Sequence, residues 1–404
     1  MRPSTTRRDP RTAGAEYLLW FLSLLGFFAI FSTTISKSPV LSLFVRGLGG
    51  SDSLLGIIAA LSPFAGILVS FPVGVLADRI GYKKLLILSS LFFAFAPLSY
   101  LFVTNPLWLI PIRFLHGWAT AILSPVASAL IAGAYPDTKG RQMGTYSSAT
   151  FVGRMAAPLV GGLLMTWGAR GAGLWEYHVV YWAAFVTGLI VLGLALIIRE
   201  PPKSDLALAP HLRRSDFADG LAYFVKDARM LSTAFVETAT YFAFGVFETY
   251  LPVYLLGLGV DPGRIGLIFS AQVLAIAALK PFFGAVADKI DKRLQIMGGI
   301  AATAGVIAVF PYVSSYGLLL AVSVVFGGAM AFSTVATAAY IADVADDRRL
   351  GTAMGAFSSV MDIGHSGGPL IVGFVITALS VRAGFLISGA VALVALIYFY
   401  TRNY

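Results

Sequence analysis

Nine ionisable side chains stand within otherwise apolar stretches of this sequence, and their types suit proton binding or the recognition of a charged ligand. Each is costly in hydrocarbon unless it faces a cavity or a partner, so each is a candidate functional residue. Carboxylates and imidazoles can exchange protons near neutral pH, and lysine and arginine can hold anionic groups. The nine are Lys37, Arg113, His116, Arg154, Glu237, Glu248, Lys280, Asp362 and His365.

The spacing of these residues relates them to one another. Position 37 plus 210 falls at 247, next to Glu248, and Arg154 plus 211 falls on His365. Asp362 precedes His365 by three residues, which places both on one face of a helix. Because a lone charge is costly, we predict that Lys37 and Glu248 approach each other at the outer end of a cavity when that end closes.

Simpler explanations compete with function at some of these positions. Lys37 and Glu237 can extend toward an interface with water, and Arg113 can belong to a structural ion pair. We favour functional roles for Arg154, Glu248 and Asp362. The residues assigned to a substrate cavity are Lys37, Arg113, His116, Arg154 and Lys280.

Twelve apolar stretches surround these residues. The chain of 404 residues is 58% hydrophobic and 12% charged, against roughly 45–50% and about 25% in soluble domains. A transmembrane helix needs about 20 mostly apolar residues, so the composition predicts an all-α membrane protein. The expected helices cover 17–45, 53–77, 85–103, 107–134, 142–167, 177–198, 230–256, 264–287, 294–313, 317–342, 351–378 and 383–401.

A polar, proline-containing stretch divides these helices into two sets of six. We expect an N-terminal half over residues 1–198, a cytoplasmic linker over 199–229 and a C-terminal half over 230–404. Within the linker, a short amphipathic helix is expected at 215–228.

The distribution of lysine and arginine predicts the orientation of the chain. With the N-terminus inside, cytoplasmic segments hold 21 of these residues and outer segments hold 4. Positive charge collects in cytoplasmic loops, so we expect both termini in the cytoplasm and the chain in the cytoplasmic (inner) membrane. Topology thereby accounts for the net charge of +9, and nucleic acid is not an expected partner.

A charged hinge occurs twice between apolar stretches. Residues 74–84 read Gly-Val-Leu-Ala-Asp-Arg-Ile-Gly-Tyr-Lys-Lys, and a near copy occupies 284–293. The two aspartates, Asp78 and Asp288, are 210 positions apart. Glycines and prolines later in each half repeat at an offset of 211, as Pro158 and Pro369 do. The chain is therefore an internal duplication in parallel orientation, which is the arrangement of one transporter class.

At these residues the chain resembles the major facilitator superfamily. Residues 74–84 resemble that family's motif between helices 2 and 3, although the second copy has Asp291 where Gly81 stands. The segment 113–117 resembles the helix 4 motif, with His116 in place of glutamine. The series 144–162 is similar to the helix 5 motif of the twelve-helix drug–proton antiporters. The resemblance covers the whole chain and implies two six-helix halves.

The hinges and the helix-bound prolines are the expected gates. The resemblance implies that Asp78 meets the N-terminal dipole of helix 11 across the seam, and that Asp288 does the same for helix 5 near Gly140. Prolines inside helices 5 and 11 bend or weaken those helices, so the two halves can rock there. The basic residues of the hinge can instead serve only to orient the loop. The gating set comprises Gly74, Asp78, Arg79, Gly81, Lys83, Lys84, Pro158, Gly284, Asp288 and Pro369.

One departure from the antiporters bears on substrate and coupling. Those proteins usually carry an acid in helix 1, whereas this chain carries Lys37 there and has its intramembrane acids in the second half. We therefore expect a cavity of net positive charge that favours anionic or zwitterionic substrates. We predict that Glu248 or Asp362 carries a transported proton, with His365 as the reserve.

These observations predict a secondary active transporter that works by alternating access, as a proton-coupled exporter of small amphipathic or anionic organic molecules. The alternatives are an uptake symporter or uniporter for an anionic metabolite, a lipid or lysolipid translocase, and a non-transporting sensor on the same fold. We expect a monomer in the lipid bilayer with a small-molecule substrate. The sequence has no cysteine, no metal-ligand spacing and no nucleophile–base pair, so no enzyme activity, cofactor or metal is expected.

Overall fold

The computed structural model describes residues 10–171, 173–198, 222–346 and 350–404, leaving aside the side chains of residues 10–16, 71, 72, 74, 75, 78, 79 and 350–352. Within this part of the chain every regular element is a helix. Twelve spans are long and apolar enough to cross a membrane. The predicted all-α membrane fold is therefore confirmed.

The first six spans form the N-half. The first span was expected as one helix over 17–45, but it is broken near Pro39. Proline lacks the amide hydrogen that a continuing helix needs, and a new helix begins at Val40. The N-half contains α1 (Pro10–Ile35), α2 (Val40–Gly47), α3 (Asp52–Ile80), α4 (Tyr82–Tyr100), α5 (Leu109–Ala134), α6 (Lys139–Gly168) and α7 (Trp175–Ile197), with a 3-10 turn at Pro106–Trp108.

The last six spans form the C-half. Local capping sets where several of them begin: the side chain of Asp227 accepts from two amides of α9, and that of Asp261 accepts from the Arg264 amide of α10. The C-half contains α9 (Ala228–Gly257), α10 (Pro262–Ala287), α11 (Lys292–Val309), α12 (Tyr316–Val344), α13 (Leu350–Ala378) and α14 (Val381–Asn403), with a 3-10 turn at Phe310–Tyr312.

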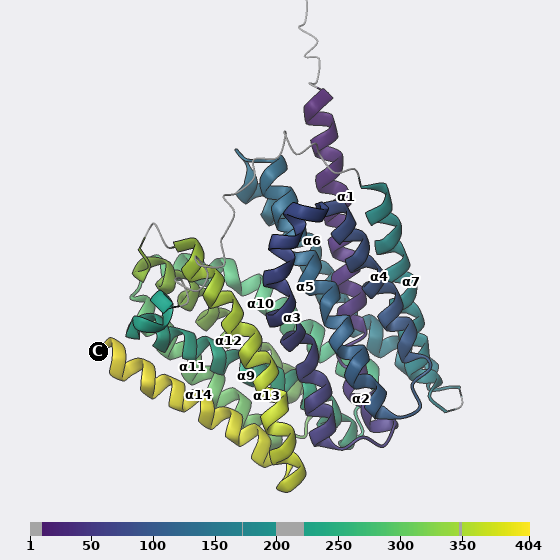
Figure 1. The fold of residues 1–404 in the computed structure, drawn as a ribbon. Helices are drawn as coiled ribbons and strands as arrows, with labels where there is room; N and C mark the ends of the chain where they lie inside the picture. Colours follow the sequence, from purple (N-terminus) through teal and green to yellow (C-terminus); the bar gives the residue numbers. More distant parts are fainter. Residues whose placement is uncertain (1–9, 172, 199–221, 347–349) are drawn as a thin grey trace, which may run out of the picture.

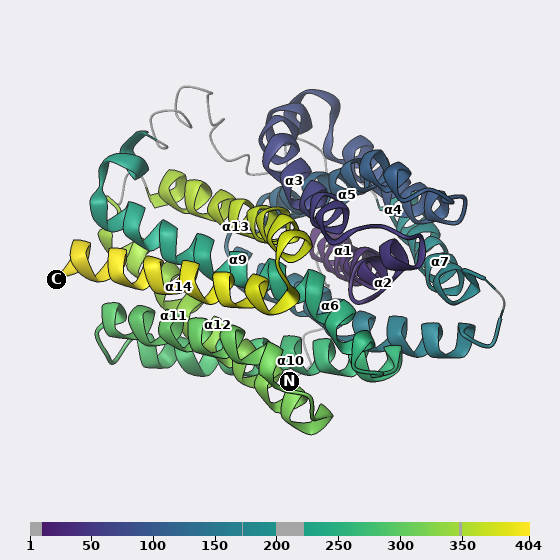
Figure 2. The same ribbon diagram turned by 90° about the horizontal axis from the view of Figure 1, so that it is seen from below.

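Two helix pairs join the halves. α3 packs against α13, and α6 packs against α10. Seen from below, these two pairs lie between the other helices of the N-half and the other helices of the C-half (Figure 2). In Figure 1 the halves meet at the bottom, where α3 begins and α13 ends, and they separate toward the top.

The two ends of the bundle differ in charge. One end, here called the basic end, is where α4, α6 and α11 begin and α14 ends, and it carries Lys83, Lys84, Lys139, Arg141, Lys292 and Arg402. The opposite end, here called the far end, carries Arg46, Arg170, Arg264 and Arg382. α7 ends and α9 begins at the basic end, and the expected linker over 199–229 lies between them in the sequence. Residues 199–221, which include the first half of the expected helix at 215–228, lie outside the described residues, whereas residues 222–226 are helical and α9 begins at Ala228.

The structure explains why the second copy of the hinge has Asp291 where the first has Gly81. Gly81 ends α3 and begins α4 with a φ of 92°, a conformation that glycine adopts without strain. In the second copy a short turn separates α10 from α11, and Asp291 has a φ of −59°. Its carboxylate accepts from the Arg293 amide and side chain. That hydrogen bonding with the guanidinium lowers the pKa of Asp291.

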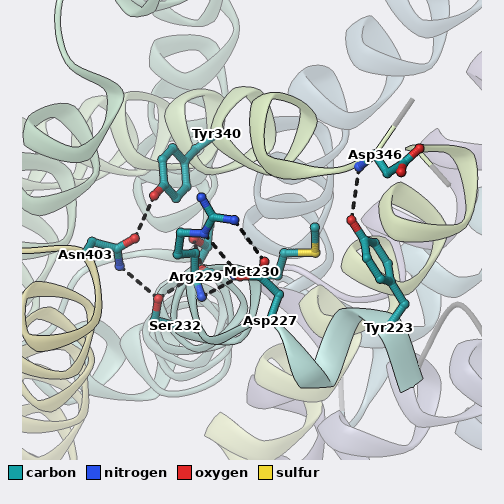
Figure 3. A network of polar contacts seen from close by, with 9 residues as sticks. Tyr223, Asp227, Arg229, Met230, Ser232, Tyr340, Asp346 and Asn403 are labelled. Atoms are coloured by element: carbon teal, nitrogen blue, oxygen red, sulfur yellow. Dashed lines mark hydrogen bonds and ion pairs between the residues drawn. The ribbon is translucent and has the colours of Figure 1, made fainter. Parts of the chain in front are cut away.

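A polar network fastens the C-half together at the basic end (Figure 3). Asn403, at the end of α14, donates to Ser232 of α9 at 3.0 Å and accepts from Tyr340 of α12 at 2.7 Å. Tyr223, which precedes α9, accepts from the Asp346 amide at 3.0 Å. These contacts join helix ends that lie far apart in sequence, so the C-half can move as one body.

Candidate functional site: a charged cavity between the halves

A cavity of about 630 Å³ lies between the N-half and the C-half. Residues of α1, α3, α5 and α6 of the N-half and of α9, α10 and α13 of the C-half line it, so both halves contribute to its wall. A second hollow of about 400 Å³, on the surface of α11 and α12, is lined only by apolar side chains and glycine. Only the first offers groups that can bind a polar ligand.

Three ionisable residues meet at one side of this cavity. The Glu248 carboxylate lies 2.6 Å from Lys37 Nζ and 2.8 Å from His365 Nε2. Lys37 belongs to the break between α1 and α2, whereas Glu248 is on α9 and His365 on α13. The predicted approach of Lys37 and Glu248 is therefore confirmed, and their contact links the two halves.

Ser38 completes this cluster and was missed in the sequence. Its hydroxyl donates to Glu248 Oε1 at 2.7 Å. Ser38 and Glu248 are 210 positions apart, the offset of the duplication, so they are symmetry mates in direct contact. The offset relates the two positions in the sequence, but serine is not ionisable, so the charge pattern indicates Lys37 and not Ser38.

Arg154 and Asp362 line the same cavity from opposite halves. Arg154 projects from α6 and Asp362 from α13. Tyr241 and Phe244 of α9 line the wall with them, their ring centroids 6.2 Å apart. The Phe244 ring lies 5.3 Å from that of His365. The cavity therefore has charged groups on two walls and an aromatic surface on a third element.

The lining does not carry the net positive charge that was expected. It holds two cations, Lys37 and Arg154, and two carboxylates, Glu248 and Asp362, besides His365. Lys280 lies outside the lining, exposed on α10. The expectation counted intramembrane charges along the sequence, and packing removed some of them from the cavity.

Arg113 and His116 are the main residues so removed. Both are 1% exposed and lie in the interior of the N-half, where Tyr100 bonds to His116 Nδ1 at 3.2 Å. Within the described part of the chain, no guanidinium nitrogen of Arg113 has a hydrogen-bond partner. In this state neither residue lines the cavity.

Glu237 does not extend to an aqueous interface, contrary to one expectation. It is 2% exposed and accepts a hydrogen bond of 2.6 Å from Thr337 of α12. A buried polar group is stable when a partner satisfies it. The Glu237–Thr337 contact therefore gives this acid a structural place within the C-half.

The far end of the seam is closed by the two prolines expected to act in gating. A Cβ atom added to Gly56 of α3 would lie 2.2 Å from the Pro369 carbonyl oxygen, and one added to Gly266 of α10 would lie 2.2 Å from that of Pro158. Tyr250 strengthens this contact by donating to the Pro369 oxygen at 2.8 Å. The duplication has thus placed the same close backbone approach on both sides of the seam.

The basic end of the seam is open by the same measure. A Cβ added to Gly140, Gly144 or Gly355 would meet no atom within 4 Å, and one added to Gly284 would meet only Val335, of its own half, at 3.9 Å. Asp288 is exposed there. The expected contact of Asp288 with the helix beginning near Gly140 is therefore absent from this state.

The remaining hinge residues act within the N-half or lie outside the described side chains. Lys83 donates to the Leu196 carbonyl at the end of α7 at 2.9 Å, a favourable place for a cation at a helix C-terminus. Lys84 is exposed. The side chains of Asp78 and Arg79, and the surroundings of Gly74, lie outside the described residues.

Comparisons with known proteins agree with this architecture. An uncharacterized MFS-type transporter of Methanocaldococcus jannaschii is 24% identical over 90% of this chain and 93% of its own length. Multidrug resistance protein 2 of Bacillus subtilis is 25% identical over 89% of this chain and 88% of its own. A solved bacterial homolog of the human lysosomal transporter Spinster, in an inward-facing and unoccupied conformation, has a TM-score of 0.82 at 17% identity, with 98% of this chain and 97% of that chain covered.

The family model of the Major Facilitator Superfamily matches residues 22–261 and 233–404. The two matched segments together span both halves, the seam and all the residues of the cavity. Twelve membrane spans, a duplicated hinge and a charged cavity between the halves are thus features of a multi-pass membrane transporter, and this chain belongs to the major facilitator superfamily.

Proposed function

We propose that this transporter is a proton-coupled exporter of small amphipathic or anionic organic molecules, working by alternating access. The observation that carries the proposal is the contact of Glu248 with Lys37 across the halves, at 2.6 Å beside the cavity. Any motion that opens the far end must separate these two groups. A charge change at Glu248 is therefore tied to the change of conformation.

The orientation follows from the positive charge at the basic end. Cytoplasmic loops collect lysine and arginine, so we place the basic end in the cytoplasm of a cell with this protein in its inner membrane. The chain would then be inward-facing here, because the seam is packed at the far end and open at the basic end. The gating role of Pro158 and Pro369 follows, since their carbonyls form the closed contact.

The direction of proton movement follows from the pairing of Glu248. In the inward-facing state Lys37 and His365 stabilise an ionised Glu248, which has released its proton to the cytoplasm. When the far end opens, the carboxylate loses Lys37 and is costly unless it takes up a proton from outside. Each cycle thus carries a proton inward, which can drive substrate outward. The name of the Bacillus relative, a multidrug resistance protein, supports export.

The test uses proteoliposomes with an imposed pH gradient, a pH-sensitive dye and a panel of aromatic carboxylates and zwitterions. For the wild type, at least one compound should move against its gradient and dissipate the pH difference. Glu248→Gln should abolish this coupling, whereas Glu176→Gln, outside the cavity at the first turn of α7, should retain it. Asp362→Asn, alone and with Glu248→Gln, tests the other acid of the lining.

Two results would contradict the proposal. Accumulation by the Glu248→Gln and Asp362→Asn double variant, still driven by the pH gradient, would remove both acids as coupling sites. A wild type that ignores the gradient while equilibrating a compound would favour a uniporter.

A further inference from the structure

Two opposite charges in the cavity are not paired with any other side chain. Within the described part of the chain, neither the Arg154 guanidinium nor the Asp362 carboxylate has an ion pair or a side-chain hydrogen bond, although both line the cavity. The backbone oxygen of Asp362 accepts a hydrogen bond of 2.6 Å from Ser366, which does not involve the carboxylate. These two groups are therefore free to bind a ligand.

The other charges of the lining satisfy one another. Lys37, Glu248 and His365 form one cluster with contacts of 2.6 and 2.8 Å, so a ligand need not neutralise them. Unpaired charges in a site enclosed by a bilayer are costly and are typically found where they bind something. The cavity can therefore bind one anionic group at Arg154 and one cationic group at Asp362.

The two charges come from opposite halves, with an aromatic surface near both. Arg154 is on α6 of the N-half and Asp362 on α13 of the C-half. Tyr241 and Phe244 of α9 line the same cavity as both charges. A flat ring can stack on such a surface while its substituents reach to either side.

We propose that the cavity selects a zwitterion with a flat aromatic body, whose anionic group binds Arg154 and whose cationic group binds Asp362. This inference rests on the proposed transport function, because it assigns the substrate of the same cavity. A volume of about 630 Å³ falls within the range of pockets that hold small organic ligands, roughly 300–1,000 Å³. Such a ligand bridges the two halves, so its binding acts on the seam that must rearrange.

The test compares three compounds with one scaffold. Para-(piperazinyl)benzoate is a zwitterion at neutral pH; its ethyl ester keeps only the cation, and its N-acetyl derivative keeps only the anion. Binding to the purified, detergent-solubilised protein is measured by titration calorimetry at constant pH. The zwitterion should bind about 10–100-fold more tightly than either single-charge compound, since a hydrogen bond to a charged group contributes about 1.5–3 kcal/mol.

Variants then assign each charge to its residue. Arg154→Gln should make the zwitterion and the ester bind equally, because the carboxylate has lost its partner. Asp362→Asn should make the zwitterion and the N-acetyl compound bind equally. Arg264→Gln and Asp261→Asn are the matched controls, since these residues form an exposed ion pair at the far end, and both should keep the wild-type preference.

Absence of zwitterion binding, or equal binding of the three compounds to the wild type, would overturn the inference. So would a preference that survives Arg154→Gln or Asp362→Asn unchanged. The binding assay uses no pH gradient, so it is independent of proton coupling. A zwitterion preference without pH-driven transport would refute the coupling mechanism alone, and the reverse result would refute only the assigned substrate class.

Discussion

Thr166 of α6 and Thr377 of α13 make equivalent hydrogen bonds on the two sides of the seam. Thr166 accepts from the Gly263 amide at 3.0 Å, and Thr377 accepts from the Ser53 amide at 3.0 Å. The threonines are 211 positions apart and their donors 210. Each bond joins the first turn of a helix in one half to a helix of the other. The duplication has thus produced a symmetric latch that holds the far end closed.

Removal of this latch should favour opening of the far end. A net hydrogen bond contributes about 0.5–1.5 kcal/mol, so replacing Thr166 and Thr377 by valine should shift the closed–open equilibrium by roughly 5–100-fold for the pair. Spin labels at Arg46 and Arg382, on the far end of either half, report the distance between the halves. The cysteine-free sequence permits labelling without background.

Thr401→Val is the control for this experiment, because the Thr401 hydroxyl donates within its own helix at 2.9 Å and is exposed. It should leave the distance distribution unchanged. An unaltered distribution in the Thr166→Val and Thr377→Val double variant would show that these bonds do not hold the seam.

Glycine is required at Gly56 and Gly266 by the closed far end. An added Cβ would lie 2.2 Å from a proline carbonyl oxygen at either position, so Gly56→Ala and Gly266→Ala should each force the halves apart there. We expect both to populate the open far end and to lower transport at least about tenfold, equivalent to roughly 1.4 kcal/mol. Gly193→Ala, where an added Cβ meets nothing within 4 Å, should behave as wild type. Normal transport by Gly56→Ala would contradict the closed contact.

Replacing one partner of the Lys37–Glu248 contact should lower the stability of the protein more than replacing both. Either Lys37→Met or Glu248→Gln leaves one charge without its partner, whereas the double variant leaves neither. Because the side chains are 20% and 11% exposed, we expect each single change to cost about 2–3 kcal/mol, somewhat below the 3–5 kcal/mol of a fully buried pair. The double variant should cost less than either. Thermal unfolding in detergent measures this cycle, and additive losses would argue against a coupled pair.

Arg113 should lower the stability of the folded protein. It is 1% exposed, and none of its guanidinium nitrogens has a hydrogen-bond partner within the described residues. A buried charge carries a desolvation cost that only a well-placed partner offsets, so we expect an apolar residue of similar length in its place to be neutral or stabilising. Arg113→Met should therefore unfold at an equal or higher temperature. Arg229→Met, on an exposed arginine, is the control. A marked fall in melting temperature would mean that Arg113 has a partner in the resting state.

The sequence by itself determined the membrane class, the twelve spans and the duplication. These are carried by composition and by regular spacing, because the bilayer requires about 20 apolar residues per helix and a duplicated gene preserves its offset. The same offset relates Glu248 to Ser38, the neighbour of Lys37, and the predicted contact between Lys37 and Glu248 is present at 2.6 Å. The break at Pro39 was not predicted, because the apolar pattern runs through it.

The tertiary structure alone decided which charges share the cavity. Arg113 and His116 are as polar in sequence as Arg154, yet they point into the interior of the N-half and are buried there. Which face of a transmembrane helix meets the cavity depends on how neighbouring helices rotate and pack, and the weakly patterned helices of this chain do not encode that rotation locally. The structure likewise decided that Asp362 and Arg154 remain unpaired on opposite walls, because their relation depends on the placement of two halves that the sequence lists one after the other.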